Sequence, residues 1–459
     1  MPEPAKGVDA RRDDLAALTM PTVLRFWLPL AASWLLMTTE TPIVNAVVAR
    51  MAGAKLQLAA IGVAMSLALA VESPIVSLLT AGNALARDRA SFCLLHQFTL
   101  GLSAILTAAM LLLSLTSLFD LAVLRLIGAP AEVTALVRPV LWALTLWPAA
   151  IAYRRFHQGV MIRYGYTRQV SYGTAIRLFT SVGLAVGGLV WGKLDGATVG
   201  GLALGAAVIA EAVYIHYLSR PAVRKVKMID SSAGEPSLTL RALIQFYAPL
   251  TLTSVIMLST APLLNFGLAR SLYPLESLAA WPVVGGQLLV VRSIGFSLQE
   301  VVVALLDGPA AMKTLWRFAV ILTVGSLALL LTLAFTPLAP WWQQQIAGLS
   351  EKLTAFAVPA LRLAVLLPVL SAIQSWLRGI VVVGKETGAI AQATVINLAV
   401  LMAVLLVGAS GDWLPGVSVA ALALTASQLV ESVWLWRGAR PARRRIREQA
   451  RVGALPPLK

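Results

Sequence analysis

Twelve apolar stretches alternate with short polar segments along the 459 residues of the chain. Each stretch is long enough to cross the hydrocarbon core of a bilayer, which takes about 20 helical residues. They cover residues 24–48, 56–81, 93–116, 136–162, 170–191, 197–218, 242–269, 277–305, 315–338, 354–383, 388–408 and 416–437. The pattern predicts an all-α polytopic membrane protein with twelve transmembrane helices.

The polar segments predict how the chain is divided. We expect an N-terminal tail (1–23), a six-helix bundle (24–219), a linker (220–241), a second six-helix bundle (242–437) and a basic C-terminal tail (438–459). Lys and Arg concentrate in both tails, in the linker and in the loops on the same side. The positive-inside rule then places both termini in the cytoplasm. We expect a multi-pass plasma-membrane protein, of the kind found in bacterial inner membranes.

Composition narrows the class further. A hydrophobic content of 58%, a charged content of 13% and a mean hydropathy of +0.81 exclude a soluble globule. The net charge of +16 does not predict nucleic-acid binding, because the basic residues lie between apolar spans and in the tails. The single cysteine, Cys93, excludes an internal disulfide and a cysteine-based metal site. The sequence has no phosphate-binding loop and no metal-spaced His/Cys cluster, so we expect a protein that is not an enzyme and has no cofactor or metal. We also expect it to be a monomer.

The chain repeats itself at an offset of 220 residues. Phe26-Trp-Leu-Pro-Leu30 recurs as Phe246-Tyr-Ala-Pro-Leu250. The same offset relates Pro42, Asn45, Arg50, Gly128, Pro148, Gly159 and Glu211 to Pro262, Asn265, Arg270, Gly348, Pro368, Gly379 and Glu431. Because each half has an even number of helices, both halves enter the membrane in the same direction. We therefore expect two pseudo-symmetric bundles, related by an axis along the membrane normal, with a substrate path between them.

Charged residues in the fourth stretch are the main functional signal. Arg154, His157 and Gln158 share one helix face, and Arg155 lies about 100° around the helix. The equivalents of Arg154 and Gln158 in the second half are glutamine and arginine, so the pair recurs in swapped order. An arginine within hydrocarbon costs at least ~2.5 kcal/mol, which makes it a functional candidate. The alternative is that these arginines extend to the headgroups and only fix topology. The residues predicted to bind substrate are Arg154, Arg155, His157, Gln158, Arg177, Arg292, Gln374 and Arg378.

A second set of polar residues is predicted to serve gating or ion coupling. Glu72 and Arg292 are equivalent in the repeat and lie near the middle of their spans, so they could meet near the axis. Such a pair would either lock one conformation or act as a gate. Glu211 and Glu431 occupy the same place in the sixth and twelfth stretches and could serve structure or proton coupling. The full gating set comprises Glu40, Asn45, Glu72, Glu211, Asn265 and Glu431.

Several motifs resemble the progressive ankylosis family, within the multidrug/oligosaccharidyl-lipid/polysaccharide exporter superfamily. They include His157–Arg163 with Tyr166-Thr167, Ala261–Asn265 with Ala269-Arg270, Trp281-Pro-Val283, Val358-Pro359, Leu361-Arg362, Pro368-Val369, Gly379, Lys385, Thr387 and Glu431-Ser432. The resemblance spans nearly all of residues 24–437. The chain departs from it in its basic tail, in lacking the acidic C-terminal extension of animal members, and in carrying Arg154 and Arg155.

The resemblance implies a MATE-like, two-bundle transporter with alternating access, whose relatives are associated with cellular export of pyrophosphate, ATP or citrate. Arginine binds phosphate and carboxylate groups well, so the basic residues favour the same substrate class. The sequence thus predicts an exporter of small polyvalent anions, with an anionic substrate and the lipid bilayer as partners. The alternatives are an ion-coupled exporter of cationic drugs, a flippase of anionic lipid-linked substrates, and a membrane scaffold.

Overall fold

The computed structural model describes residues 18–230, 238–306, 309–384, 388–411 and 413–453, and these segments are almost entirely helical. Side chains beyond residue 444 are left undescribed. Lys385, Thr387 and most of the predicted N-terminal tail lie outside the described residues. Between the helices, an isolated bridge joins Leu272 to Pro415. The predicted all-α architecture is confirmed.

The helices of the first half are α1 (Met20–Val48), α2 (Ala54–Glu72), η2 (Ser73–Ser77), α3 (Leu78–Leu85), α4 (Arg89–Leu115), α5 (Leu118–Asp120), η3 (Leu121–Ile127), α6 (Ala131–Ala143), α7 (Trp147–Arg163), α8 (Thr167–Trp191) and α9 (Gly196–Lys227). Those of the second half are α10 (Leu240–Leu258), α11 (Thr260–Arg270), α12 (Pro274–Phe296), α13 (Leu298–Leu305), α14 (Pro309–Phe335), α15 (Leu338–Trp341), η4 (Trp342–Ile346), α16 (Glu351–Leu363), α17 (Leu367–Val383), α18 (Gly388–Gly411) and α19 (Gly416–Gly453).

The number of membrane spans agrees with the sequence. Within the described ranges, 10 helices are long and apolar enough to cross a bilayer, and the count is 12 when each of two bent pairs is one span. The bent pairs are α6 with α7 and α16 with α17, each bent by 42°. Pro148 and Pro368 lie in the first turns of α7 and α17. Proline has no N–H to bond the preceding turn, which explains why both spans break there.

The internal repeat is visible in the helix boundaries. The first residues of α1, α2, α4, α6, α7 and α9 lie 220 residues before those of α10, α12, α14, α16, α17 and α19. Helices extend past the expected bundle limits at both ends: α1 and α10 begin at Met20 and Leu240, and α9 and α19 continue to Lys227 and Gly453. An apolar stretch marks only the part of a helix inside hydrocarbon, whereas Ala, Arg and Lys sustain the helix beyond it.

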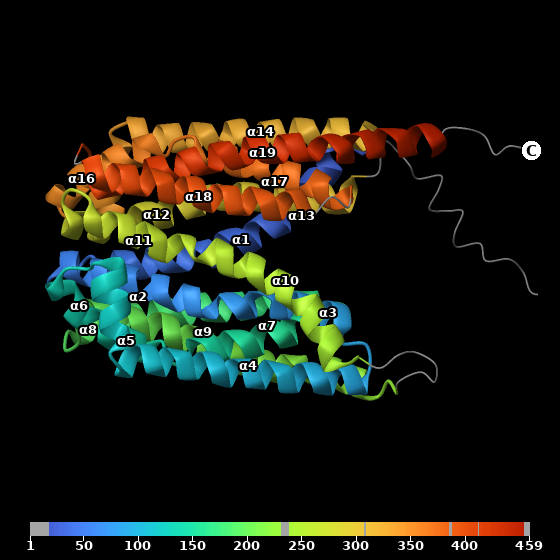
Figure 1. Ribbon diagram of the computed structural model, residues 1–459, viewed down its shortest axis with the longest axis horizontal. Helices are drawn as coiled ribbons and strands as arrows, with labels where there is room; N and C mark the ends of the chain where they lie inside the picture. The colour runs from blue at the N-terminus through green and yellow to red at the C-terminus, as the bar shows by residue number, and fades with distance from the viewer. Residues whose placement is uncertain (1–17, 231–237, 307–308, 385–387, 412, 454–459) are drawn as a thin grey trace, which may run out of the picture.

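Figure 1 shows the two halves as separate bundles, with helices of the first half below and most of those of the second half above. We call the end that carries Arg50 and Arg270 the latch end, and the end where α9 finishes and α10 begins the linker end. Two helices cross between the bundles. Near the linker end α1 packs on the second bundle, with Trp27 5.6 Å from Phe318 between ring centroids, while α10 packs on η2 of the first.

Candidate functional site

A buried carboxylate organises the polar residues of the first bundle. Glu211 on α9 is fully buried. Its carboxylate accepts hydrogen bonds from Arg154 Nη1 at 2.6 Å and from Gln158 Nε2 at 3.3 Å, both on α7. Arg177 on α8 approaches the same carboxylate at 3.8 Å and pairs with Glu40 on α1 at 2.6 Å. Alternating charges therefore connect α1, α8, α9 and α7 in one network.

The second bundle has the corresponding arrangement around Glu431 on α19. This carboxylate accepts hydrogen bonds from Arg378 Nη2, from Gln374 Nε2 at 3.2 Å and from Asn397 Nδ2 at 2.9 Å. Gln374 also donates to the carbonyl of Gln428 at 3.0 Å. The Arg/Gln pair is thus kept in both halves because both members of each pair bond one carboxylate.

The swapped order of the pair has a geometric explanation. Residues four apart on a helix lie one above the other on the same face, so either one can carry the charge and still reach the glutamate. Asn397 is the repeat equivalent of Arg177; Asn397 donates a hydrogen bond to the central glutamate of its bundle, and Arg177 forms an ion pair with that of its own. Within the described part of the chain, no hydrogen bond or ion pair joins the two networks.

Glu72 and Arg292 do not meet near the axis, so the expected pairing is wrong. Glu72 accepts a hydrogen bond from Trp147 Nε1 on α7, within its own bundle. Arg292 Nε donates to Ser371 Oγ on α17 at 2.7 Å, within the other bundle. Glu72 and Arg292 therefore each bond within their own bundle, because a polar partner on a neighbouring helix is closer than the opposite bundle.

Two of the predicted arginines lack a carboxylate partner. Arg155 and Arg292 are both partly buried, and neither forms an ion pair with any residue the structure describes. Nε of Arg155 is buried without a hydrogen-bond partner. One arginine in each bundle therefore forms no ion pair within the described part of the chain.

His157 lies apart from the glutamate network, although the sequence grouped it with Arg154. Its Nδ1 lies 2.9 Å from the carbonyl oxygen of Tyr153, and its ring stacks on Tyr153 with centroids 4.0 Å apart. Both rings line a groove between α4, α7 and α9 on the side of the first bundle. The spacing along the sequence does not show that Arg154 faces the glutamate network while His157, three residues later on α7, faces the groove.

Two arginines join the bundles at the latch end in a reciprocal way. Arg50, which follows α1, donates to the carbonyls of Gln345 at 2.5 Å and Ile346 at 3.1 Å in the second bundle. Arg270, at the end of α11, donates to the carbonyls of Arg125, Leu126 and Ile127 in the first bundle at 2.9, 3.0 and 2.5 Å. We call these two sets of bonds the arginine latch.

The arginine latch depends on two glycines. Gly128 and Gly348 have φ of +81° and +77°, the left-handed region that glycine occupies without strain. A Cβ on either residue would come within 2.9 Å of Arg270 Nη1 or 2.8 Å of Arg50 Nη1, respectively. The sequence relates Arg50 to Arg270 and Gly128 to Gly348 through the repeat, but it does not indicate a function for them. Their matching offsets were the available signal.

Asn45 and Asn265 also cross between the bundles. Asn45 Nδ2 donates to the carbonyl of Pro282 at 3.2 Å. Asn265 Nδ2 donates to the carbonyl of Gly62 at 3.0 Å and to Ser66 Oγ at 2.8 Å. The two predicted gating asparagines thus hold α1 against α12 and α11 against α2.

A charged cluster adds to the closure of the latch end. Glu276 at the start of α12 pairs with Lys55 of the first bundle at 3.1 Å and with Lys352 at 3.4 Å. Together with the arginine latch, it concentrates charged contacts between the bundles at this end.

The sequence matches no known family or curated protein, whereas the structure is similar to several solved structures. No model of a known protein family matches the chain, and no curated protein matches it. Among solved structures, an inward-facing multidrug resistance MATE transporter of the MOP superfamily is similar over 89% of this chain and 96% of its own, with 14% identity and a TM-score of 0.64.

Two further structures match comparably. Lipid II flippase MurJ in an inward closed conformation is 14% identical, with a TM-score of 0.67 over 90% of this chain and 87% of its own. A MOP superfamily transporter from Pyrococcus furiosus, described as having a binding pocket of reverse polarity, is 15% identical, with a TM-score of 0.54 over 97% and 99%. The chain therefore has a MATE-like fold and is a multi-pass membrane protein.

Proposed function

We propose that the protein is a secondary transporter that exports small polyvalent anions of the citrate, ATP and pyrophosphate class by alternating access between its two bundles. The observation that carries the proposal is that one buried or partly buried arginine in each bundle forms no ion pair with any residue the structure describes. Arg155 and Arg292 have no carboxylate partner among the described residues, one in each bundle. A polyvalent anion would supply the charge-assisted hydrogen bonds that these guanidinium groups lack.

The carboxylates argue against a cation exporter. Glu40, Glu211 and Glu431 each pair with an arginine, and Glu72 accepts a hydrogen bond from Trp147. A cationic drug would have to compete with these partners, whereas an anion meets two guanidinium groups that form no ion pair with the described residues. The Pyrococcus furiosus structure supports the idea that one fold can hold pockets of different polarity. The resemblance to the progressive ankylosis family supports the same substrate class.

The closed latch end suggests which side takes up substrate. Charged contacts between the bundles gather around Arg50, Arg270 and Glu276, so the bundles are held together at this end. If the positive-inside rule holds, the linker end faces the cytoplasm, and this conformation accepts substrate from there. An inside-negative potential then favours anion exit by ~2.3 kcal/mol per charge per 100 mV, so no coupling ion is required.

Efflux from proteoliposomes tests the proposal. We expect vesicles loaded with radiolabelled citrate, pyrophosphate or ATP to lose label in response to an applied potential. Arg155→Gln and Arg292→Gln should each slow efflux about tenfold, because losing one charge-assisted contact costs about 1.5 kcal/mol. Arg138→Gln is the control, since it removes a partly exposed arginine near the latch end that pairs with Asp120. Efflux of cationic ethidium but of none of the anions would refute the proposal.

A further inference from the structure

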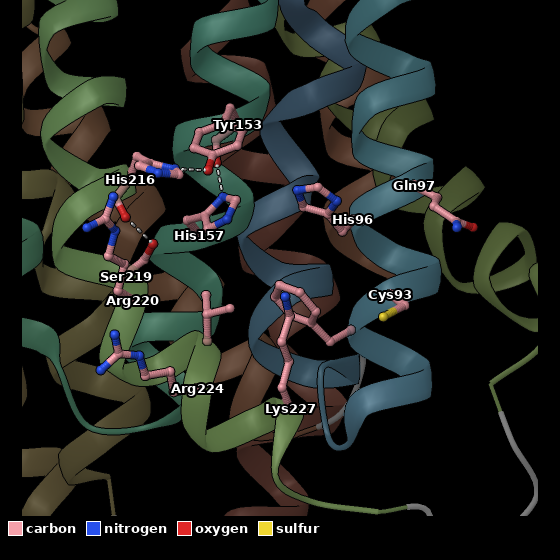
Figure 2. A pocket seen from close by; sticks show the side chains of 12 residues that line it. Cys93, His96, Gln97, Tyr153, His157, His216, Ser219, Arg220, Arg224 and Lys227 are labelled. Atoms are coloured by element: carbon pink, nitrogen blue, oxygen red, sulfur yellow. Dashed lines mark hydrogen bonds between the residues drawn. The ribbon is translucent and has the colours of Figure 1, made fainter.

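All three histidines of the chain lie in one groove on the side of the first bundle. His96 on α4, His157 on α7 and His216 on α9 line a cavity of about 490 Å³. Figure 2 shows the three imidazoles and Tyr153 facing one another across this space. α4 supplies no residue to the glutamate network, so this groove is distinct from the proposed transport site. We call it the histidine groove.

The side chains of the histidine groove hold one another in place. Tyr153 Oη lies 2.5 Å from His216 Nδ1, and the Tyr153 ring stacks on His157. His96 lies 5.9 Å from His157 between centroids, with the rings perpendicular. The result is an ordered floor of aromatic rings that presents ring edges and polar atoms to a ligand.

Three cations follow along α9 at the linker end of the groove. Arg220, Arg224 and Lys227 are spaced four and three residues apart, which places them on one helix face. The contacts of Arg220 and Lys227 are with the rings of Tyr217 and Phe92, at 4.6 and 5.5 Å. Among the described residues that line the groove, none is acidic. The positive charge is therefore available to an anion.

The second bundle provides an internal comparison. A groove of about 880 Å³ lies at the repeat-equivalent position between α14, α17 and α19. In place of His96, Tyr153, His157 and His216 it carries Trp316, Ile373, Leu377 and Trp436. The fold therefore accepts apolar side chains at all four positions. The polar side chains of the first copy are therefore not required by the fold, which favours a role in binding a polar ligand.

We propose that the histidine groove binds an anionic phosphate compound, with the phosphate on Arg220, Arg224 and Lys227 and the remainder of the molecule on the rings of Tyr153 and His157. Arginine and lysine are the usual ligands of phosphate, and the three cations lie at the linker end of α9, beyond the apolar stretch that ends at residue 218. The phosphate can therefore belong to a lipid headgroup or to a soluble compound. The proposal concerns a second site and does not depend on the transported substrate.

Native mass spectrometry on the purified full-length protein tests the proposal with two probes, phosphatidic acid and ATP. The test variant combines Arg220→Gln, Arg224→Gln and Lys227→Gln. Its matched control combines Arg25→Gln, Arg317→Gln and Arg437→Gln, which removes as many exposed charges outside both grooves. At about fivefold per cation, the test variant should bind the preferred probe roughly 100-fold more weakly, and the control should bind it like the parent.

The two probes identify the source of the phosphate. A selective loss of phosphatidic acid binding assigns the groove to a lipid headgroup, and a selective loss of ATP binding assigns it to a soluble compound. Should the triple variant unfold, His216→Trp gives a second test, because Trp436 shows that the fold accepts tryptophan at the equivalent position. The proposal fails if the parent binds neither probe, or if the control weakens binding as much as the test variant.

Discussion

Replacing Arg50 and Arg270 together with alanine should open the latch end of the protein. The two side chains form five hydrogen bonds across the bundle interface, two from Arg50 and three from Arg270. All five acceptors are backbone carbonyls in the last turns of the π-helical segments η3 and η4. Loss of both arginines removes the bonds but leaves both bundles intact.

The size of the effect follows from the exposure of the two residues. Both arginines are exposed, which places each bond at the low end of the usual range, near ~0.5 kcal/mol. Five bonds then stabilise the closed latch end by roughly 2 to 3 kcal/mol. Since 1.4 kcal/mol is a factor of ten, the double variant should shift the balance between closed and open latch ends by roughly 30- to 100-fold.

Distances between spin labels on the two bundles measure this shift. Labels at Glu132 on α6 and Glu351 on α16, both exposed at the latch end, report the separation of the bundles there. The exposed Cys93 is first replaced by serine. The parent should give one short distance, and the double variant should add a longer one that becomes the major population.

Arg125→Ala is the matched control for the arginine latch. Arg125 contributes only its backbone carbonyl, so this variant removes an exposed arginine at the same end and keeps the bond from Arg270. It should leave the distance distribution unchanged. If the double alanine variant also keeps the parental distribution, the latch does not hold the bundles together and the reasoning is wrong.

The fold could be predicted from the sequence because each apolar stretch is long enough to cross a bilayer and the two halves align without a gap. Helix boundaries that recur at an offset of 220 residues agree with the pairs read from the chain. The sequence also singled out Arg154, Gln158, Gln374 and Arg378 as a duplicated pair. It did not show that each pair bonds a glutamate, because the contact between α7 and α9 depends on how two helices rotate against each other.

Other contacts of the site could not be predicted from the sequence. Arg50 and Arg270 bind backbone carbonyls, and a carbonyl carries no residue-specific signal. Glu72 and Arg292 have equivalent positions, but symmetry does not determine which neighbour each side chain bonds. His157 was grouped with Arg154 from the sequence, whereas it contacts Tyr153 on its own helix and His96 on α4.

Two buried positions allow further tests by thermal unfolding of the purified protein. Glu211→Gln should destabilise it by ~3–5 kcal/mol, because Arg154 and Arg177 lose a buried counter-charge; an unchanged unfolding temperature would show that Glu211 is not needed to neutralise them. Gly159→Ala should cost ~1–3 kcal/mol or more, since its Cβ would collide with backbone atoms of α3 that have no flexible end to move aside. Gly101→Ala on α4 is the control, because a Cβ there meets no atom within 4 Å and alanine favours the helix by roughly 0.5–1 kcal/mol. Equal unfolding temperatures for the two alanine variants would contradict the close packing of α7 on α3, on which the position of the whole α7 face depends.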